Sequence, residues 1–80
     1  MGIRPRAISV TPLENYRLLL TFDNHERKIF DVTPYIRGNW FGELKKPEVF
    51  KSVRIAGLSV EWPNGQDICP DCLYDDSVSV

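Results

Sequence analysis

The clearest pattern along the chain is an alternation of apolar and polar side chains between residues 16 and 32. In the run 16–22, every even-numbered side chain is apolar or aromatic. The run 26–32 continues the pattern, with Phe30 and Val32 at even positions. Alternation with a period of two is typical of a β-strand with one buried face, so the two runs predict two strands that share a core face.

The parity of these runs fixes the register of the hairpin. Residues that face each other across an antiparallel pair share a face, so even positions must pair with even positions. This requires an odd number of loop residues, and we predict a three-residue loop with His25 in the left-handed conformation. Leu18 then lies opposite Phe30 on the core face, and Leu19 lies opposite Ile29 on the reverse face. Two further pairs follow from the same register: Tyr16 with Val32, and Arg17 with Asp31.

A first strand is predicted over residues 4–12. Its alternation places Ile8 and Val10 on one face and Ala7 and Ser9 on the other. Together with the hairpin, this strand makes a three-stranded meander.

The second half of the chain is divided by turn and capping residues. Thr33 as N-cap, Pro34 at the first helical position and Gly38 as the stop predict one helical turn. The other predicted elements are a helix at 47–53, strands at 53–56 and 58–62 joined through Gly57, a turn at 63–66, and a one-turn helix at 70–74 started by Cys69 and Pro70. We expect residues 75–80 to be a frayed tail.

These elements predict one α+β domain over residues 1–80, built on a small antiparallel sheet of about five strands. In chain order the predicted fold comprises the N-terminal three-stranded meander, short helices, a C-terminal hairpin and the one-turn helix. A composition that is 42% hydrophobic indicates a globular chain. Because a chain of 80 residues buries a modest share of its surface, we expect a net stability of only a few kcal/mol.

Charge and hydropathy exclude several classes of function. The net charge of -1 gives no general attraction to a phosphate backbone, so binding to nucleic acid without a partner is disfavoured. No apolar run approaches the ~20 residues that cross a bilayer, and the amino terminus lacks the layout of a secretory signal. Two cysteines are too few for a disulfide scaffold. We therefore expect a cytoplasmic protein with reduced thiols and no membrane partner.

Cys69 and Cys72 have the spacing of a redox or metal-binding pair. Structural zinc requires four ligands, and the remaining soft ligand, His25, is assigned to a distant hairpin tip. Four carboxylates lie close in sequence and disfavour a thiolate: Asp67, Asp71, Asp75 and Asp76. The two cysteines are candidates for a thiol redox or metal site, and the alternative is that they serve as small apolar groups. We expect no cofactor.

The sequence contains no complete catalytic set. His25 is the single histidine, and histidine is enriched in left-handed turns, which accounts for it without chemistry. Asp75 and Asp76 lie in the expected tail, without apolar surroundings that raise a pKa. These observations favour a protein that is not an enzyme.

A modest basic cluster comprises Lys45, Lys46, Lys51 and Arg54, with Trp40 and Phe41 shortly before it. Basic and aromatic residues together can bind nucleic acid. The alternative is that the aromatics supply the core and the lysines coat an exposed helix.

Four large side chains are candidates for a partner interface: Leu19, Ile29, Trp62 and Tyr74. Leu19 and Ile29 lie on the reverse face of the hairpin, and small domains often hide exposed apolar faces by association. Tryptophan and tyrosine are common interface anchors. The alternative is that Trp62 and Tyr74 close the core.

Three stretches resemble a known family. They are PRAISVTP at 5–12, the hairpin from 20 that ends FDVTPY at 30–35, and EWPNGQDICPDCLY at 61–74. Together they resemble the small bacterial proteins grouped as domain of unknown function 2442. The resemblance implies an α+β fold without a known activity, and a gene that often lies beside another small gene in an arrangement suggestive of a toxin and an antitoxin. His25 stands where that family usually has glycine, and Cys72 stands at a variable position.

The combined interpretation is a non-enzymatic interaction module that binds another small protein or forms a homo-oligomer. The resemblance suggests the antitoxin-like or regulatory half of a two-gene pair. One alternative is a thiol redox or metal-binding protein that uses Cys69 and Cys72. A further alternative is a DNA-binding accessory that acts only with a partner, because the partner must supply the missing positive charge.

Overall fold

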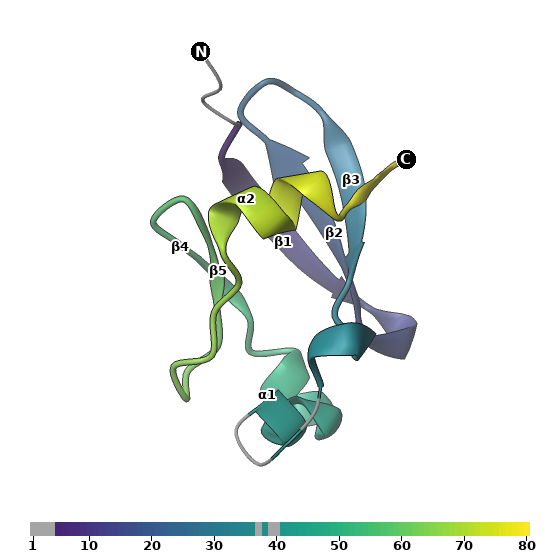
Figure 1. The fold of residues 1–80 in the computed structure, drawn as a ribbon, viewed down its shortest axis with the longest axis vertical. Coiled ribbons are helices and arrows are strands. Elements are labelled where there is room, and N and C mark those ends of the chain that lie inside the picture. Colours follow the sequence, from purple (N-terminus) through teal and green to yellow (C-terminus); the bar gives the residue numbers. More distant parts are fainter. Residues whose placement is uncertain (1–4, 37, 39–40) are drawn as a thin grey trace.

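The computed structural model describes residues 5–36, 38 and 41–80 (Figure 1). A four-stranded antiparallel sheet has the order β1-β2-β3-β6, and β4 and β5 form a separate hairpin. The strands are β1 (Ala7–Leu13), β2 (Arg17–Phe22), β3 (Arg27–Asp31), β4 (Arg54–Ala56), β5 (Ser59–Glu61) and β6 (Val78–Ser79). The helices are α1 (Pro47–Phe50) and α2 (Pro70–Asp75), and the 3-10 turns are η1 (Glu14–Tyr16), η2 (Thr33–Tyr35) and η3 (Phe41–Lys45). The predicted α+β fold on a small antiparallel sheet is confirmed.

The β2–β3 hairpin has the predicted register. Leu18 lies directly opposite Phe30, as the parity argument requires. The Phe22 N–H donates to the Glu26 carbonyl oxygen at 2.9 Å, so the loop between them has three residues. His25 is the last of the three and has a φ of 72°, which is the predicted left-handed conformation.

The predicted faces of the first strand are wrong at its beginning. The pairing with β2 shifts between Ala7 and Ser9, which marks a β-bulge. A bulge places two residues opposite one, so the alternation of faces changes across it. As a result Ala7 is buried and packs in the core with Val10, whereas Ile8 is 51% exposed.

Thr33 is not the N-cap of the turn after β3. Val32 occupies that position, and the Asp31 carboxylate accepts the Thr33 N–H at 2.9 Å. An aspartate that accepts from the backbone two residues later makes an Asx turn, and this replaces the predicted threonine cap. Pro34 is accordingly the second residue of the turn, and not the first as predicted.

The end of the chain also differs from the prediction of a frayed tail. Residues 78–79 pair with β3 as strand β6, which joins Val78 to Ile29 and Ser79 to Lys28. The pairing was missed because two residues carry too little pattern to predict a strand.

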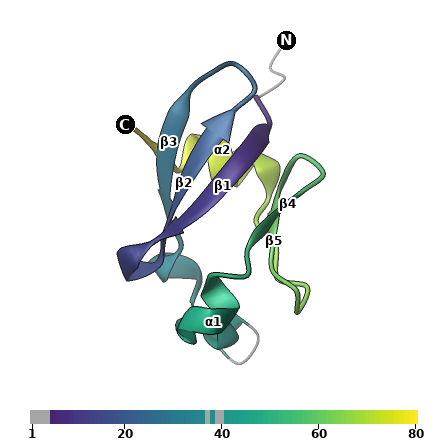
Figure 2. The same cartoon turned by 180° about the vertical axis from the view of Figure 1, so that it is seen from behind.

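The core lies on one side of the four-stranded sheet. Figure 1 shows α2 crossing this side of the sheet, with the β4–β5 hairpin beside β1. In Figure 2, β1, β2 and β3 are in front and no described helix lies over them. The buried apolar side chains are Ala7, Leu18, Leu20, Phe22, Phe30, Val32, Leu44, Phe50, Val60, Trp62, Ile68 and Leu73. No helix in the described part of the chain has the length and apolar character to span a bilayer.

The left-handed conformation of His25 leads to a stability prediction. Replacement His25→Val should lower the free energy of unfolding by about 1 kcal/mol or more, because a β-branched side chain is strained at positive φ. Replacement His25→Gly should leave the stability equal or higher, since glycine adopts this conformation readily. Urea unfolding followed by tryptophan fluorescence measures both, with His25→Asn as a control that tolerates the conformation. Equal stability of the valine variant and the wild type would contradict the turn assignment.

Candidate functional site

The side of the sheet opposite α2 is an uncovered surface with apolar side chains (Figure 2). We call it the open face and define it by the residues that the register places there: Ser9, Thr11, Leu13, Arg17, Leu19, Thr21, Arg27, Ile29, Asp31 and Val78. Adjacent strands align these side chains in rows across the sheet. The central row contains Leu19, Ile29 and Val78 side by side on β2, β3 and β6. Leu19 and Ile29 are half-buried, and Val78 is 70% exposed.

Charged side chains lie on both sides of this apolar row. Arg17 and Asp31 face each other on one side, and Arg27 lies opposite Thr21 on the other. The Arg17 Nε donates to the Glu14 carbonyl oxygen at 3.5 Å, and Asp31 caps η2. Within the part of the chain that the structure describes, neither Asp31 nor Arg27 forms an ion pair. The open face is therefore apolar in its centre and charged at its two ends.

A hollow of about 280 Å³ lies where the open face meets β6. Its lining combines the apolar row with carboxylate and guanidinium groups: Arg17, Ile29, Asp31, Asp76, Val78 and Ser79.

Trp62 does not contribute to any accessible surface. It is 0% exposed, and its Nε1 donates to the Phe50 carbonyl oxygen at 2.9 Å. Its ring also lies 6.2 Å from the Phe50 ring. Of the two roles that the sequence left open for Trp62, an interface anchor or a residue that closes the core, its burial against Phe50 of α1 supports the second.

Tyr74 lies on α2 and faces the covered side of the sheet. Its ring contacts Phe22 edge-on at 5.1 Å between centroids, and Lys28 Nζ lies 3.8 Å from the ring centroid. The Tyr74 hydroxyl donates to the Glu26 carboxylate, and Lys28 Nζ donates to the Tyr74 carbonyl oxygen at 2.9 Å. Tyr74 therefore holds α2 against the sheet and lies away from the open face.

The hydrogen bond between Tyr74 and Glu26 shifts the pKa of both groups. Donation by the Tyr74 hydroxyl, and then by the Asn24 amide, holds the pKa of Glu26 below its ordinary value. The same bond to the Glu26 carboxylate raises the pKa of the Tyr74 hydroxyl. The structure therefore divides the four predicted partner residues, since it brings Leu19 and Ile29 together on the open face and leaves Trp62 and Tyr74 on the other side.

Cys69 and Cys72 lie at the start of α2. Cys69 is the exposed N-cap residue, and Cys72 is half-buried in the first turn. Loss of solvent contact, followed by the neighbouring Cys69 thiol, raises the pKa of the Cys72 thiol, which disfavours the reactive thiolate. Among the described residues, no group of three or more His, Cys, Asp or Glu side chains is placed to hold a metal ion. These observations add no support to a redox or metal function.

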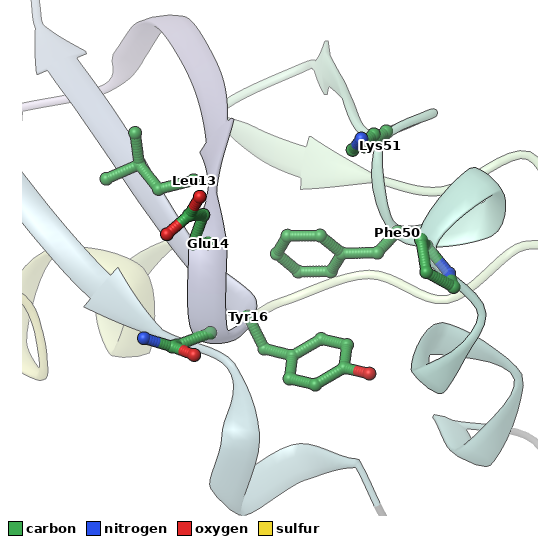
Figure 3. Close-up of a pocket in the computed structure, with 7 residues that line it drawn as sticks. Leu13, Glu14, Tyr16, Phe50 and Lys51 are labelled. Carbon is green, nitrogen blue, oxygen red and sulfur yellow. The ribbon is translucent and has the colours of Figure 1, made fainter.

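A second hollow, of about 380 Å³, lies between η1 and α1. Figure 3 shows Leu13 and Glu14 on one side of it and Phe50 and Lys51 on the other. Tyr16 lies at its base, with its ring 5.4 Å from the Phe50 ring in an edge-on contact. Sequence reasoning predicted a turn at residues 13–15 but missed this hollow, which is lined by Asn15 and Tyr16 in successive left-handed conformations; asparagine favours that conformation, whereas nothing local predicts it for Tyr16.

The predicted basic cluster is exposed at Lys45, Lys46, Lys51 and Arg54. Arg54 Nη2 forms an ion pair with Glu61 at 2.7 Å, so one of the four charges is neutralised. Trp40 lies outside the described residues, and so does the side chain of Phe41. The cluster is accordingly a small part of a surface that carries both signs of charge.

The fold and the open face define a small α+β domain with one covered and one uncovered sheet face. The chain belongs to the family described as "Protein of unknown function (DUF2442)", whose model matches residues 7–79. The resemblance noted from the sequence is thus confirmed, and the family description assigns no activity. Searches among curated proteins and among solved structures each found no match.

The Glu26–Tyr74 bond leads to a prediction on pH. The pKa of Glu26 is lowered in the folded state, so its contribution to stability is full above its ordinary value of 4.5 and is lost as the pH falls through the lower, folded value. Stability should therefore fall in acid, and Glu26→Gln should make that fall shallower. Glu48→Gln, which changes an exposed glutamate on α1, is the matched control. Thermal unfolding between about pH 3 and 7 measures the slopes, and identical slopes in the Glu26→Gln variant and the wild type would contradict the bond.

The two thiols should react at different rates. Cys72 should be alkylated by iodoacetamide several-fold more slowly than Cys69 near neutral pH, because its pKa is raised and it is half-buried. Peptide mass spectrometry after timed quenching measures both rates in one sample. Unfolding in urea should remove the difference, and equal rates in the folded protein would argue against the described burial of Cys72.

Proposed function

We propose that this chain is a non-enzymatic protein-interaction module that binds a partner protein on its open face. The observation that carries the proposal is the apolar row of Leu19, Ile29 and Val78 on the side of the sheet that no described helix covers. The solvent face of an antiparallel sheet is usually polar. A contiguous apolar row on that face is typical of a surface that another molecule covers.

The edges of the sheet are less suited to binding than its face. β1 forms one edge and carries Pro12, which lacks an N–H and interrupts the row of donors that an added strand requires. β6 forms the other edge and contains only two residues. Docking on the face is therefore favoured over strand addition.

The arrangement of reactive groups supports a function other than catalysis. The single histidine, His25, lies at the β2–β3 loop, at the opposite end of β2 from the hollow beside Tyr16. The raised pKa of Cys72 disfavours a nucleophilic thiol. The sequence left two kinds of partner open: another small protein, or a second copy of this chain. Binding of a small protein encoded nearby would correspond to the antitoxin-like role that the resemblance implies.

Capture from the native host tests the proposal with a matched pair of variants. Val78→Asp places a charge in the apolar row, and Leu58→Asp places the same charge at an exposed leucine, 58% accessible, in the β4–β5 loop. Partner recovery should fall at least about tenfold for Val78→Asp, because burying an unpaired charge in an interface costs more than about 1.4 kcal/mol. Leu58→Asp should recover the partner as the wild type does.

Quantitative mass spectrometry of N-terminally tagged chains at endogenous expression measures the recovery. Circular dichroism must show that both variants fold, and the high exposure of both positions favours this. Undiminished recovery by the Val78→Asp variant would show that the open face is not the binding surface.

A further inference from the structure

We infer that the open face binds a second copy of this chain, face to face. The two-fold axis lies between the two sheets, parallel to their planes; it passes over Ile29 and runs perpendicular to the strands. The inference rests on the proposed function and names the partner of the same surface. It is carried by the order of charged and apolar side chains along β3, together with the apolar row across the sheet.

Three open-face residues of β3 alternate with its core-facing residues. In order they are Arg27, Ile29 and Asp31, so a positive and a negative group flank an apolar one at equal distances. A two-fold axis at Ile29 places Arg27 of each copy over Asp31 of the other. Two-fold interfaces require such self-complementarity, because each contact between two different residues occurs twice.

The same axis places the apolar row of one copy over the apolar row of the other copy. Leu19, Ile29 and Val78 of one copy each lie over the same residue of the second copy, at the spacing of about 10 Å that separates packed sheets. Strands of two packed sheets lie within about 30° of parallel, which this axis allows. Apolar side chains would then meet along the centre of the interface, where burial contributes most.

The charged groups that the second copy would pair lie at the surface, and the Asp31 carboxylate accepts the Thr33 N–H through Oδ1, which leaves its Oδ2 for Arg27 of the second copy. Arg27 and Asp31 are both exposed, and neither forms an ion pair within the described part of the chain. Arg17 would lie over Thr21 of the second copy, so no like charges lie directly over each other on the β2 and β3 strands of the two copies. Exposed pairs add little energy but fix orientation, so the two Arg27–Asp31 contacts specify this axis.

A second possible axis runs parallel to the strands, between β2 and β3. It would place Arg17 over Asp31 of the second copy and Val78 over Thr11. This arrangement separates Val78 from other apolar side chains. The axis at Ile29 is therefore favoured, and the two arrangements predict different charge partners for Asp31.

The size of the open face sets the expected affinity. Four strands about 4.8 Å apart and about five residues long give a face on the order of 300 Å² in projection. For two copies this is about 600 Å², which is below the ~1,000 Å² of a stable specific interface, so we expect a weak and reversible dimer with a dissociation constant on the order of 10–100 µM.

Charge exchange in two separate chains tests the axis. Arg27→Asp places two carboxylates over each other in a homodimer, and Asp31→Lys does the same with two cations. Each variant alone should sediment as a monomer at concentrations where the wild type is a dimer. An equimolar mixture should recover the dimer, since each mutated residue then faces an opposite charge, and so should a single chain that carries both changes.

The chain with both changes also controls for folding. Asp31→Lys removes the acceptor of the Thr33 N–H, and the double variant lacks it as well. If the double variant recovers the dimer, the loss of the dimer in the Asp31→Lys variant is due to the changed charge and not to damage to η2. The axis at Ile29 would be overturned if the mixture of Arg17→Asp with Asp31→Lys recovered the dimer and the mixture of Arg27→Asp with Asp31→Lys did not.

Two outcomes distinguish this inference from the proposed function. A wild-type chain that sediments as a monomer up to about 500 µM, above the expected dissociation constant, overturns the second copy as the partner. The proposed function survives that result if Val78→Asp still loses a captured protein. A wild-type dimer that Val78→Asp leaves intact overturns the open face as the dimer interface.

Discussion

The parity of the β2–β3 hairpin decides which side chains the rest of the chain must cover. A three-residue loop keeps even positions opposite even positions, so that Leu18 meets Phe30 on one face and Leu19 meets Ile29 on the other. A loop of two residues would oppose residues of different parity and mix the two faces. The covered core and the open face are thus two consequences of the same loop, and the left-handed conformation of His25 is what closes it.

The described helices cover only one of these faces. α2 and the β4–β5 hairpin lie on the even face, and the largest side chain, Trp62, is buried completely to complete the core. No described helix lies over the other side of β1, β2 and β3 (Figure 2). The odd face is left to solvent or to another molecule, although it keeps apolar side chains in a row.

The parts of the fold that the sequence predicts are those with a repeated local pattern. Alternation over many residues predicts the hairpin, and proline after Cys69 predicts the start of α2. The failures depend on contacts between distant segments or on single backbone irregularities. Ile8 is exposed because of a bulge, and Val78 pairs with Ile29 although nothing in two residues indicates a strand.

The candidate site was predicted in part for the same reason. Leu19 and Ile29 follow from parity, so their shared face is confirmed by the register. For Trp62 the sequence left both roles open because the same aromatic character suits a core and an interface, and only the packing against Phe50 distinguishes them. Val78, which completes the apolar row, depends on a pairing between segments far apart in the chain.

Residues 28 and 29 show that the open face departs from the ordinary pattern of an amphipathic strand. Lys28 points to the core face and is only 8% exposed, while Ile29 points to the open face. A buried ammonium group is tolerated only with partners, and here Tyr74 supplies both a carbonyl oxygen and an aromatic ring. Stability alone would favour the reverse order, with the apolar residue inside and the lysine outside. Such local conflicts are expected where function constrains a sequence, and this one lies at the centre of the apolar row.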